Sequence, residues 1–418
     1  MTERERRGWI IVGAICVTMF FIWGAINSGA VFFLPVLKHF GWTRAKFSEA
    51  LSIGWVTGGL AGPAIGWLAD RVNPKRMILA GATITGLLWL ALSRATSFGE
   101  FLLINGLFGI CVGASTTIPC SLIIAGWFER RRGLAIGIAF AAAPIGGAAI
   151  TPLANHVIET AGWRAGYVAL GLPILLIVVP LILFLVRPAG PADGTESGGS
   201  AGGSEAAGQE AVLPGLELGQ AVRTRSFWLI CAVQLLTGST LGMGPHFVAY
   251  LTGIGYTANF AALAVSFYLT MTTLGSLLGG PFADRATARA AMIATCILGA
   301  VGAGGLLGAA YVVGLAANIL AGGFALGALG VQMPLVIIES LGVRRLGSLL
   351  GVTGVFYTAG AAVSPIVAGR IFDVTGSYAI TISSFIVMLA LSAIALFGCR
   401  TLAGEEAQLT SPESSAAA

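Results

Sequence analysis

Few residues of this 418-residue chain could exchange a proton near neutral pH. The histidines are His39, His156 and His246, and imidazole is the side chain that titrates between pH 5 and 8 without a large shift. Only His246 falls well inside an apolar stretch, beside a proline and near two glycines that weaken a helix. Two roles are open for it: a cavity-lining proton acceptor or hydrogen-bond donor, or a histidine that is hydrogen-bonded within the fold.

Patterns that would indicate catalysis or metal binding are missing from the sequence. The three scattered histidines form no metal triad, and neither an H-E-x-x-H motif nor a phosphate-binding G-K-S/T loop occurs. The six cysteines have no C-x-x-C spacing and fall mostly in apolar stretches, which is typical of small core residues. We expect no cofactor, no metal and no enzymatic activity.

The composition is typical of an integral membrane protein. It is 56% hydrophobic and 10% charged, with a mean hydropathy of +0.89, whereas soluble domains carry about 25% charged residues. Its 60 glycines have no collagen period, and small residues let membrane helices approach closely. The net charge of +5 therefore reflects membrane topology, and we expect no nucleic-acid partner.

A bilayer core of about 30 Å requires roughly 20 apolar residues per helix, and twelve stretches of the chain satisfy this. They cover residues 9–34, 48–69, 76–94, 100–125, 133–155, 164–186, 227–252, 259–282, 289–311, 313–338, 347–371 and 377–398. The sequence predicts an all-α polytopic membrane protein with twelve transmembrane helices in two groups of six. Most Lys and Arg residues fall in the loops of one side, which the positive-inside rule assigns to the cytoplasm. We expect a multi-pass protein of the cell membrane, with an uncleaved first helix and both termini cytoplasmic.

The predicted organisation follows from these spans. It comprises a cytoplasmic N-terminus (1–8), a first six-helix bundle (9–186), a flexible cytoplasmic linker (187–226), a second six-helix bundle (227–398) and a disordered cytoplasmic tail (399–418). The linker is rich in Gly, Ser, Ala and Glu and cannot bury enough apolar surface to order itself. Residues 216–225 at its end are compatible with a short surface helix.

One loop is duplicated in the two halves. GWLADRVNPKR at residues 66–76 corresponds to GPFADRATAR at residues 280–289, and 214 residues separate Gly66 from Gly280. The glycine permits close helix packing, and the aspartate leaves the membrane beside basic residues, where it can pair with them or face a positive helix N-terminus. Such contacts would hold the halves together on the cytoplasmic side and break when that side opens. The gating residues predicted from the loop are Asp70, Arg71, Arg76, Asp284 and Arg285.

With this duplicated loop the sequence resembles the major facilitator superfamily, whose signature is G-x-x-x-D-R-x-G-x-R/K-R/K. Asn73 replaces the usual second glycine, and the second copy departs from the pattern after Arg285. The resemblance implies the major facilitator fold, two six-helix bundles around a central cavity, and alternating access by rocking of the bundles.

Two further segments resemble the monocarboxylate transporters and their bacterial relatives, the oxalate:formate antiporters. They are WFERRRGLAIGIA at residues 127–139 and SPIVAGRIFDVTGSY at residues 364–378. The charged residues of that group are missing: Thr272 and Ser276 stand at its aspartate and arginine positions, and Tyr357 stands at the lysine position of the antiporters. The antiporters' aromatic residue is also replaced, by Thr117. Because a dianion would lack a cation in the cavity, we expect oxalate not to be a substrate.

The remaining polar residues within the spans define the predicted substrate site: Asn27, Thr117, His246, Ser276, Gln332 and Tyr357. Each could equally make an interhelical hydrogen bond. The leading hypothesis is a secondary transporter of a small, monocarboxylate-like organic acid by proton symport or exchange, with His246 as the proton-coupling residue. The alternatives are a uniporter or efflux carrier of a neutral or weakly polar solute and, more remotely, a non-transporting membrane sensor. The expected partners are the small-molecule substrate, protons if transport is coupled, and the bilayer, and we expect a functional monomer.

Overall fold

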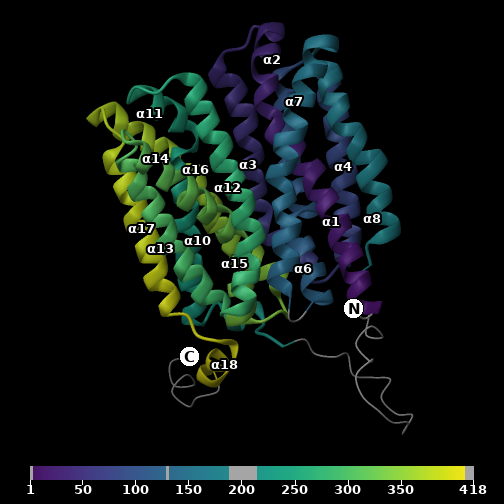
Figure 1. Cartoon of the computed structure of the whole chain (residues 1–418). Helices are drawn as coiled ribbons and strands as arrows, with labels where there is room; N and C mark the ends of the chain where they lie inside the picture. Colours follow the sequence, from purple (N-terminus) through teal and green to yellow (C-terminus); the bar gives the residue numbers. More distant parts are fainter. Residues whose placement is uncertain (1–2, 129–130, 188–213, 410–418) are drawn as a thin grey trace.

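A computed structural model of the chain describes residues 3–128, 131–187 and 214–409 (Figure 1). This described part is helical, apart from loops and one antiparallel bridge between Gly215 and Gly342. The purple-to-teal first half and the green-to-yellow second half form two bundles that stand side by side.

The first bundle is built from these helices: α1 (Glu3–Asn27), η1 (Ser28–Phe32), α2 (Phe33–Phe40), α3 (Arg44–Ala69), α4 (Pro74–Arg94), α5 (Phe98–Ser115), α6 (Thr117–Trp127), α7 (Arg132–Pro173), η2 (Ile174–Val178) and α8 (Val179–Leu185). The connecting loops supply the helix caps. The side chains of Thr43, Asn73 and Ser97 accept hydrogen bonds from backbone N–H groups at the starts of α3, α4 and α5.

The second bundle follows a short helix and ends before another. Its helices are α9 (Leu218–Ala221), α10 (Arg225–Ser239), η4 (Thr240–His246), α11 (Phe247–Gly253), α12 (Ala258–Arg285), α13 (Ala288–Leu307), α14 (Val312–Ala317), η5 (Asn318–Gly322), α15 (Gly323–Leu341), α16 (Leu346–Thr375), α17 (Ala379–Phe397) and α18 (Leu402–Leu409). Thr224, Thr257 and Thr287 cap α10, α12 and α13 in the same way.

Within the described residues, ten helical stretches are long and apolar enough to cross a membrane. One of them, residues 132–185, is 54 residues long and turns at Gly162, whose φ of 84° interrupts the helix, so it crosses twice. Helix α3 adds the remaining crossing: its 26 residues are less apolar, and it packs against α5 and α16. The twelve predicted crossings and the all-α fold are therefore confirmed.

The face that carries both chain ends is called here the terminal face; it holds the loops after α3, α6, α12 and α15 (Figure 1). Near it the bundles meet through two helix pairs, α3 with α16 and α7 with α12. Glycines make these contacts close: a Cβ on Gly66 would lie 2.1 Å from the carbonyl oxygen of Gly347, and one on Gly280 would lie 1.8 Å from that of Gly133. Only glycine allows backbones to approach this closely.

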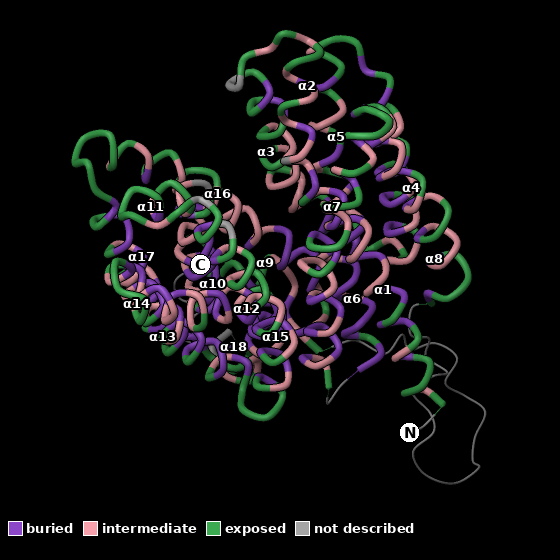
Figure 2. Tube along the Cα trace, turned by 45° about the horizontal axis from the view of Figure 1, so that its top comes forward, coloured by how far each residue is buried: buried purple, intermediate pink, exposed green. Residues whose placement is uncertain are grey.

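Toward the opposite face the same helices lose their partners. In α16, Leu346 and Leu349 are fully buried, whereas Val363 and Ile366 expose 55% and 72% of their surface. In α3, Ala69 is buried but Trp55 is 60% exposed. In Figure 2, green stretches of exposed residues lie around α3 and α11. The structure is thus closed at the terminal face, and its two bundles separate toward the other side.

The tail and the linker differ from their predictions where the structure describes them. Residues 402–409, predicted to be disordered, form helix α18, whose Glu405 is 1% exposed and accepts a hydrogen bond from the hydroxyl of Ser226 on α10. The prediction rested on the small and polar residues of this segment and did not anticipate a buried glutamate as its anchor; Leu402 of α18 also packs against the core. Residues 188–213 of the linker and 410–418 of the tail lie outside the described part. Of the stretch 216–225, predicted to form a short surface helix, residues Leu218–Ala221 form helix α9, and Ala221 is buried.

Candidate functional site

Each duplicated aspartate caps a helix of the other bundle. The N–H groups of Gly347 and Ser348, at the start of α16, donate to Oδ1 and Oδ2 of Asp70, both at 2.8 Å. The N–H groups of Gly133 and Leu134, at the start of α7, donate to Oδ1 and Oδ2 of Asp284 at 2.8 and 2.9 Å. A helix N-terminus has unsatisfied N–H groups and a partial positive charge, so a carboxylate is its natural partner.

The two contacts obey the internal repeat. The offset of 214 residues that relates Gly66 to Gly280 also relates Gly133 to Gly347 and Gly137 to Gly351. A Cβ on Gly137 would lie 2.5 Å from the carbonyl oxygen of Ser276, and one on Gly351 would lie 2.2 Å from that of Gly62. The aspartates and the glycine contacts therefore form two copies of one interface, each of which joins the two bundles.

The basic residues of the duplicated loop do not bond to its aspartates. The Arg71 guanidinium lies over the indole ring of Trp67, 4.0 Å from the ring centroid, and Arg76 and Arg285 are exposed. The sequence left two partners open for the aspartates, basic side chains or helix N-termini. The structure places them on helix N-termini.

His246 has a partner for each ring nitrogen. Its Nε2 lies 3.1 Å from the carbonyl oxygen of Pro365 on α16, and its Nδ1 lies 3.2 Å from the hydroxyl of Tyr378 at the start of α17. A carbonyl only accepts, so the hydrogen bonds assign the proton to Nε2 and leave Nδ1 to accept from Tyr378. Through these two contacts His246 joins η4, α16 and the start of α17 near the opposite face.

Ser276 and Gln332 both connect α12 to α15. The Ser276 hydroxyl lies 3.1 Å from the carbonyl oxygen of Thr272 and 3.3 Å from that of Gly327, and Gln332 donates through Nε2 to the carbonyl oxygen of Gly279 at 3.3 Å. Gln332 is fully buried, and its Oε1 has no hydrogen-bond partner. The structure brings these two candidate residues together, with polar groups directed between helices.

The other predicted substrate residues lie on different helices. Tyr357 of α16 is partly buried, and its carbonyl oxygen would lie 2.2 Å from a Cβ on Gly238 of α10. Thr117 is partly buried at the start of α6, after a break at Thr116, and Asn27 lies against Gly147 of α7. The six predicted substrate residues therefore do not form a single cluster in the structure.

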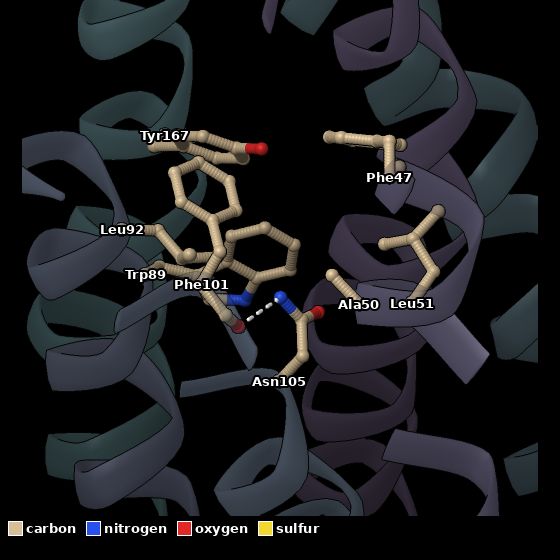
Figure 3. Close-up of a pocket in the computed structure, with 9 residues that line it drawn as sticks. Phe47, Ala50, Leu51, Trp89, Leu92, Phe101, Asn105 and Tyr167 are labelled. Carbon is tan, nitrogen blue, oxygen red and sulfur yellow. Dashed lines mark hydrogen bonds between the residues drawn. The ribbon is translucent and has the colours of Figure 1, made fainter. Parts of the chain in front are cut away.

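A small cavity inside the first bundle was not predicted from the sequence. Figure 3 shows it between Phe47, Ala50 and Leu51 of α3, Trp89 and Leu92 of α4, Phe101 and Asn105 of α5, and Tyr167 of α7. Its volume is about 20 Å³, enough for a water molecule, which needs roughly 10–15 Å³. The buried Trp89 Nε1 has no hydrogen-bond partner, and the amide of Asn105 donates to the carbonyl oxygen of Phe101. The cavity lies within one bundle and not between the two.

A larger cavity of about 160 Å³ lies at the terminal face beside the Asp70 contact. Both bundles and the connecting segment line it: Trp67, Asp70, Arg71, Glu217, Leu218, Arg345 and Ser348. The sequence reasoning missed Glu217. Its one sequence signal was a Glu-x-x-Gln spacing at a helix start, which predicts a capping box and not an interbundle position.

No group of three or more His, Cys, Asp or Glu residues that could hold a metal ion occurs among the residues described by the structure.

Comparisons with known proteins agree with this architecture. The family model of the Major Facilitator Superfamily matches residues 14–312, and the chain belongs to this superfamily. Monocarboxylate transporter 13 of Bos taurus is 27% identical over 391 residues, which cover 91% of this chain and 85% of that protein. Monocarboxylate transporter 1 of Rattus norvegicus is 24% identical over 417 residues, which cover 93% of this chain and 84% of that protein. The chain is thus a multi-pass membrane transporter related to the monocarboxylate transporters.

Solved structures show the same fold. The E. coli fucose:proton symporter FucP superposes with a TM-score of 0.71 at 17% sequence identity, covering 93% of this chain and 98% of that one. The proton:xylose symporter XylE gives a TM-score of 0.72 at 13% identity, covering 97% and 99%. At such identities the similarity establishes the fold alone.

Proposed function

We propose that the chain carries a small monocarboxylate-like organic acid across the cell membrane by proton symport or exchange, through alternating access. The observation that carries the mechanism is the pair of aspartate caps. Both join the bundles at one face while the helices separate at the other, and all four N–H···O bonds must break when the terminal face opens. We further propose that the terminal face is cytoplasmic, that both termini lie there, and that the monomer is the functional unit.

The choice of substrate class follows from relatives and from charge. The relatives that match over most of the chain are named for monocarboxylates. Thr272, Ser276 and Tyr357 stand where the transporters that the sequence resembles carry charged residues. The two negative charges of a dianion would therefore have no cation opposite them at the proposed site. A single carboxylate is easier to satisfy with neutral donors. The proposed site comprises Asn27, Thr117, His246, Ser276, Gln332 and Tyr357.

Proton coupling is assigned to His246 because it is the histidine that falls inside an apolar span, and imidazole is the side chain suited to proton exchange near neutral pH. Protonation at Nδ1 would prevent this nitrogen from accepting the Tyr378 hydrogen bond, so Tyr378 would have to reorient. A proton at His246 would thereby alter the contact between η4 and α17. This gives the residue a means of coupling proton binding to a helix contact.

A second candidate function is facilitated diffusion of a neutral solute. It is supported by the absence of charged side chains at the three substituted positions, Thr272, Ser276 and Tyr357.

A ligand screen on purified protein separates the two functions. Ligand binding raises the apparent stability by about 2.7 kcal/mol when the ligand is present at 100 times its dissociation constant. We expect short-chain monocarboxylates to raise the melting temperature, and dicarboxylates and uncharged amides of the same size to leave it unchanged. Stabilisation by the amides, with none from the carboxylates, would instead identify a carrier of neutral solutes.

A further inference from the structure

We propose that Glu217, in the segment leading into the second bundle, helps to hold the terminal face closed by attracting Arg71 of the first bundle across the cavity between them. The inference rests on the alternating-access mechanism proposed above and adds a positioning residue to it.

The backbone around Glu217 is fixed to the second bundle. The N–H of Leu216 donates to the carbonyl oxygen of Leu341 at 2.9 Å, and the N–H of Val343 donates to that of Pro214 at 3.0 Å. This antiparallel bridge brings Gly215 and Gly342 together, and both have positive φ, 142° and 87°. A Cβ on Gly342 would lie 2.3 Å from the Cα of Gly215, so the approach requires glycine. Glu217 therefore moves with α15 and α16.

The Glu217 side chain is oriented at the start of α16. Its Oε2 accepts from Nε of Arg345 at 2.7 Å, and its Oε1 lies 3.0 Å from an Arg344 guanidinium nitrogen. A capping box with Gln220 fixes its own backbone. The hydrogen bond from Arg345, followed by the charges of Arg345, Arg344 and Arg71, keeps the pKa of Glu217 below its ordinary range, so the carboxylate is charged at neutral pH.

Arg71 faces this carboxylate from the other bundle. Both residues line the 160 Å³ cavity, and the nearer acid, Asp70, already uses both oxygens on the N–H groups of α16. The ion pairs in the described part of the chain do not include Arg71, whose guanidinium lies over Trp67. Glu217, whose oxygens are held by Arg344 and Arg345 of the second bundle, is the other carboxylate that lines this cavity.

The balance of charge gives the direction of the effect. With Glu217 present, Arg344 and Arg345 are partly neutralised where they approach the first bundle. Without it, Arg71 would face two uncompensated arginines, and like-charge repulsion would favour separation of the bundles. Loss of the Glu217 charge should therefore shift the transporter toward the state that is open at the terminal face.

The repeat supplies a matched control residue. The position 214 residues before Glu217 is Glu3, which pairs with Arg7 four residues along the same helix at 2.6 Å. Glu3 and Glu217 are both partly exposed acids in glutamate–arginine pairs, but the bond of Glu3 is local to α1.

Hydrogen–deuterium exchange in lipid nanodiscs tests the proposal without knowledge of the substrate. The reporters are the N–H groups of Gly133 and Leu134, which Asp284 binds in the other interbundle contact and which a local disturbance around Glu217 would not reach. We expect Glu217→Gln to accelerate their exchange about two- to fivefold, the range for a partly exposed ion pair. We expect Glu3→Gln to leave the exchange unchanged.

A double-mutant cycle with Arg71→Gln tests the partner. If Glu217 acts on Arg71, adding Glu217→Gln to Arg71→Gln will leave the exchange rate nearly unchanged, because the residue on which the Glu217 charge acts is already missing. Effects of Glu217→Gln and Arg71→Gln that multiply independently would overturn the proposal, as would wild-type exchange in Glu217→Gln. Asp70→Asn is the reference: if it fails to accelerate exchange at Gly133, the closed contact itself, and with it the proposed mechanism, is wrong.

Discussion

At the scale of single residues, His246 is a histidine held within the fold by hydrogen bonds. Both of its ring nitrogens have partners, Pro365 and Tyr378, so the side chain stabilises the arrangement of η4, α16 and α17. This is the hydrogen-bonded histidine that the sequence left open as one alternative. The role in proton coupling stays a prediction. It would require a proton on Nδ1, the atom that contacts the Tyr378 hydroxyl.

Replacement of His246 separates the two roles. We expect His246→Ala to abolish accumulation driven by a pH gradient while substrate exchange at equal pH on both sides persists, since exchange needs no net proton movement. Uptake and counterflow in proteoliposomes measure the two activities. Tyr378→Phe is the control: it removes the hydroxyl that bonds to Nδ1 but keeps the imidazole, so equal losses in both variants would indicate a structural role only.

Ser276 and Gln332 show what residue types alone leave undecided. A polar side chain in an apolar span either lines a cavity or joins two helices, and interhelical hydrogen bonds contribute only about 0.6 kcal/mol on average. Both residues direct polar groups to backbone carbonyls between α12 and α15. The sequence placed both residues inside membrane spans as candidates for the substrate site or for interhelical hydrogen bonds. Which way each side chain points depends on how packing rotates its helix.

At the scale of helices, the closed contact depends on backbone approach. The sequence motif predicted a glycine where helices pack tightly and an aspartate beside it, and the structure adds the partners, the starts of α16 and α7. The segment WFERRRGLAIGIA, noted for its resemblance to transporters, contains the two N–H groups that Asp284 binds. Motifs far apart in the chain are thus two sides of one interface.

A methyl group at Gly280 should open this interface. Its Cβ would lie 1.8 Å from the carbonyl oxygen of Gly133, so α7 and α12 must separate, and overpacking of this kind typically costs about 1–3 kcal/mol. We expect Gly280→Ala to increase the population with a longer distance between spin labels at the exposed Arg187 and Arg223, measured by double electron–electron resonance in a cysteine-free background.

Gly330→Ala on α15 is the matched control, because no atom lies within 4 Å of a Cβ built there. An unchanged distance distribution in Gly280→Ala would mean that the glycine contact does not keep the terminal face closed.

At the scale of the whole molecule, two interfaces related by a 214-residue offset close one face together. Neither bundle can move without breaking its own aspartate cap and that of the other bundle. Because the contacts are short and directional, the interface favours two discrete arrangements over continuous bending. This is the property that a carrier with alternating access requires.

If protons drive the cycle, an inward proton gradient should concentrate the substrate inside proteoliposomes. We expect accumulation above the external concentration with an acidic exterior and simple equilibration without the gradient. The measurement is uptake of a labelled monocarboxylate at several imposed gradients, with a protonophore as control. Equilibration in all conditions would favour the neutral-solute uniporter.

The sequence by itself determined the membrane class, the twelve crossings and the duplicated loop, because hydropathy, charge placement and an internal repeat are properties of the chain. Only the tertiary structure decided which helix ends the aspartates cap, that α18 docks through Glu405, and that Glu217 lies at the interbundle cavity. These contacts join residues separated by up to 278 positions. Hydrogen bonds and ion pairs act over a few ångströms, so their partners are set by packing and cannot be read from local sequence.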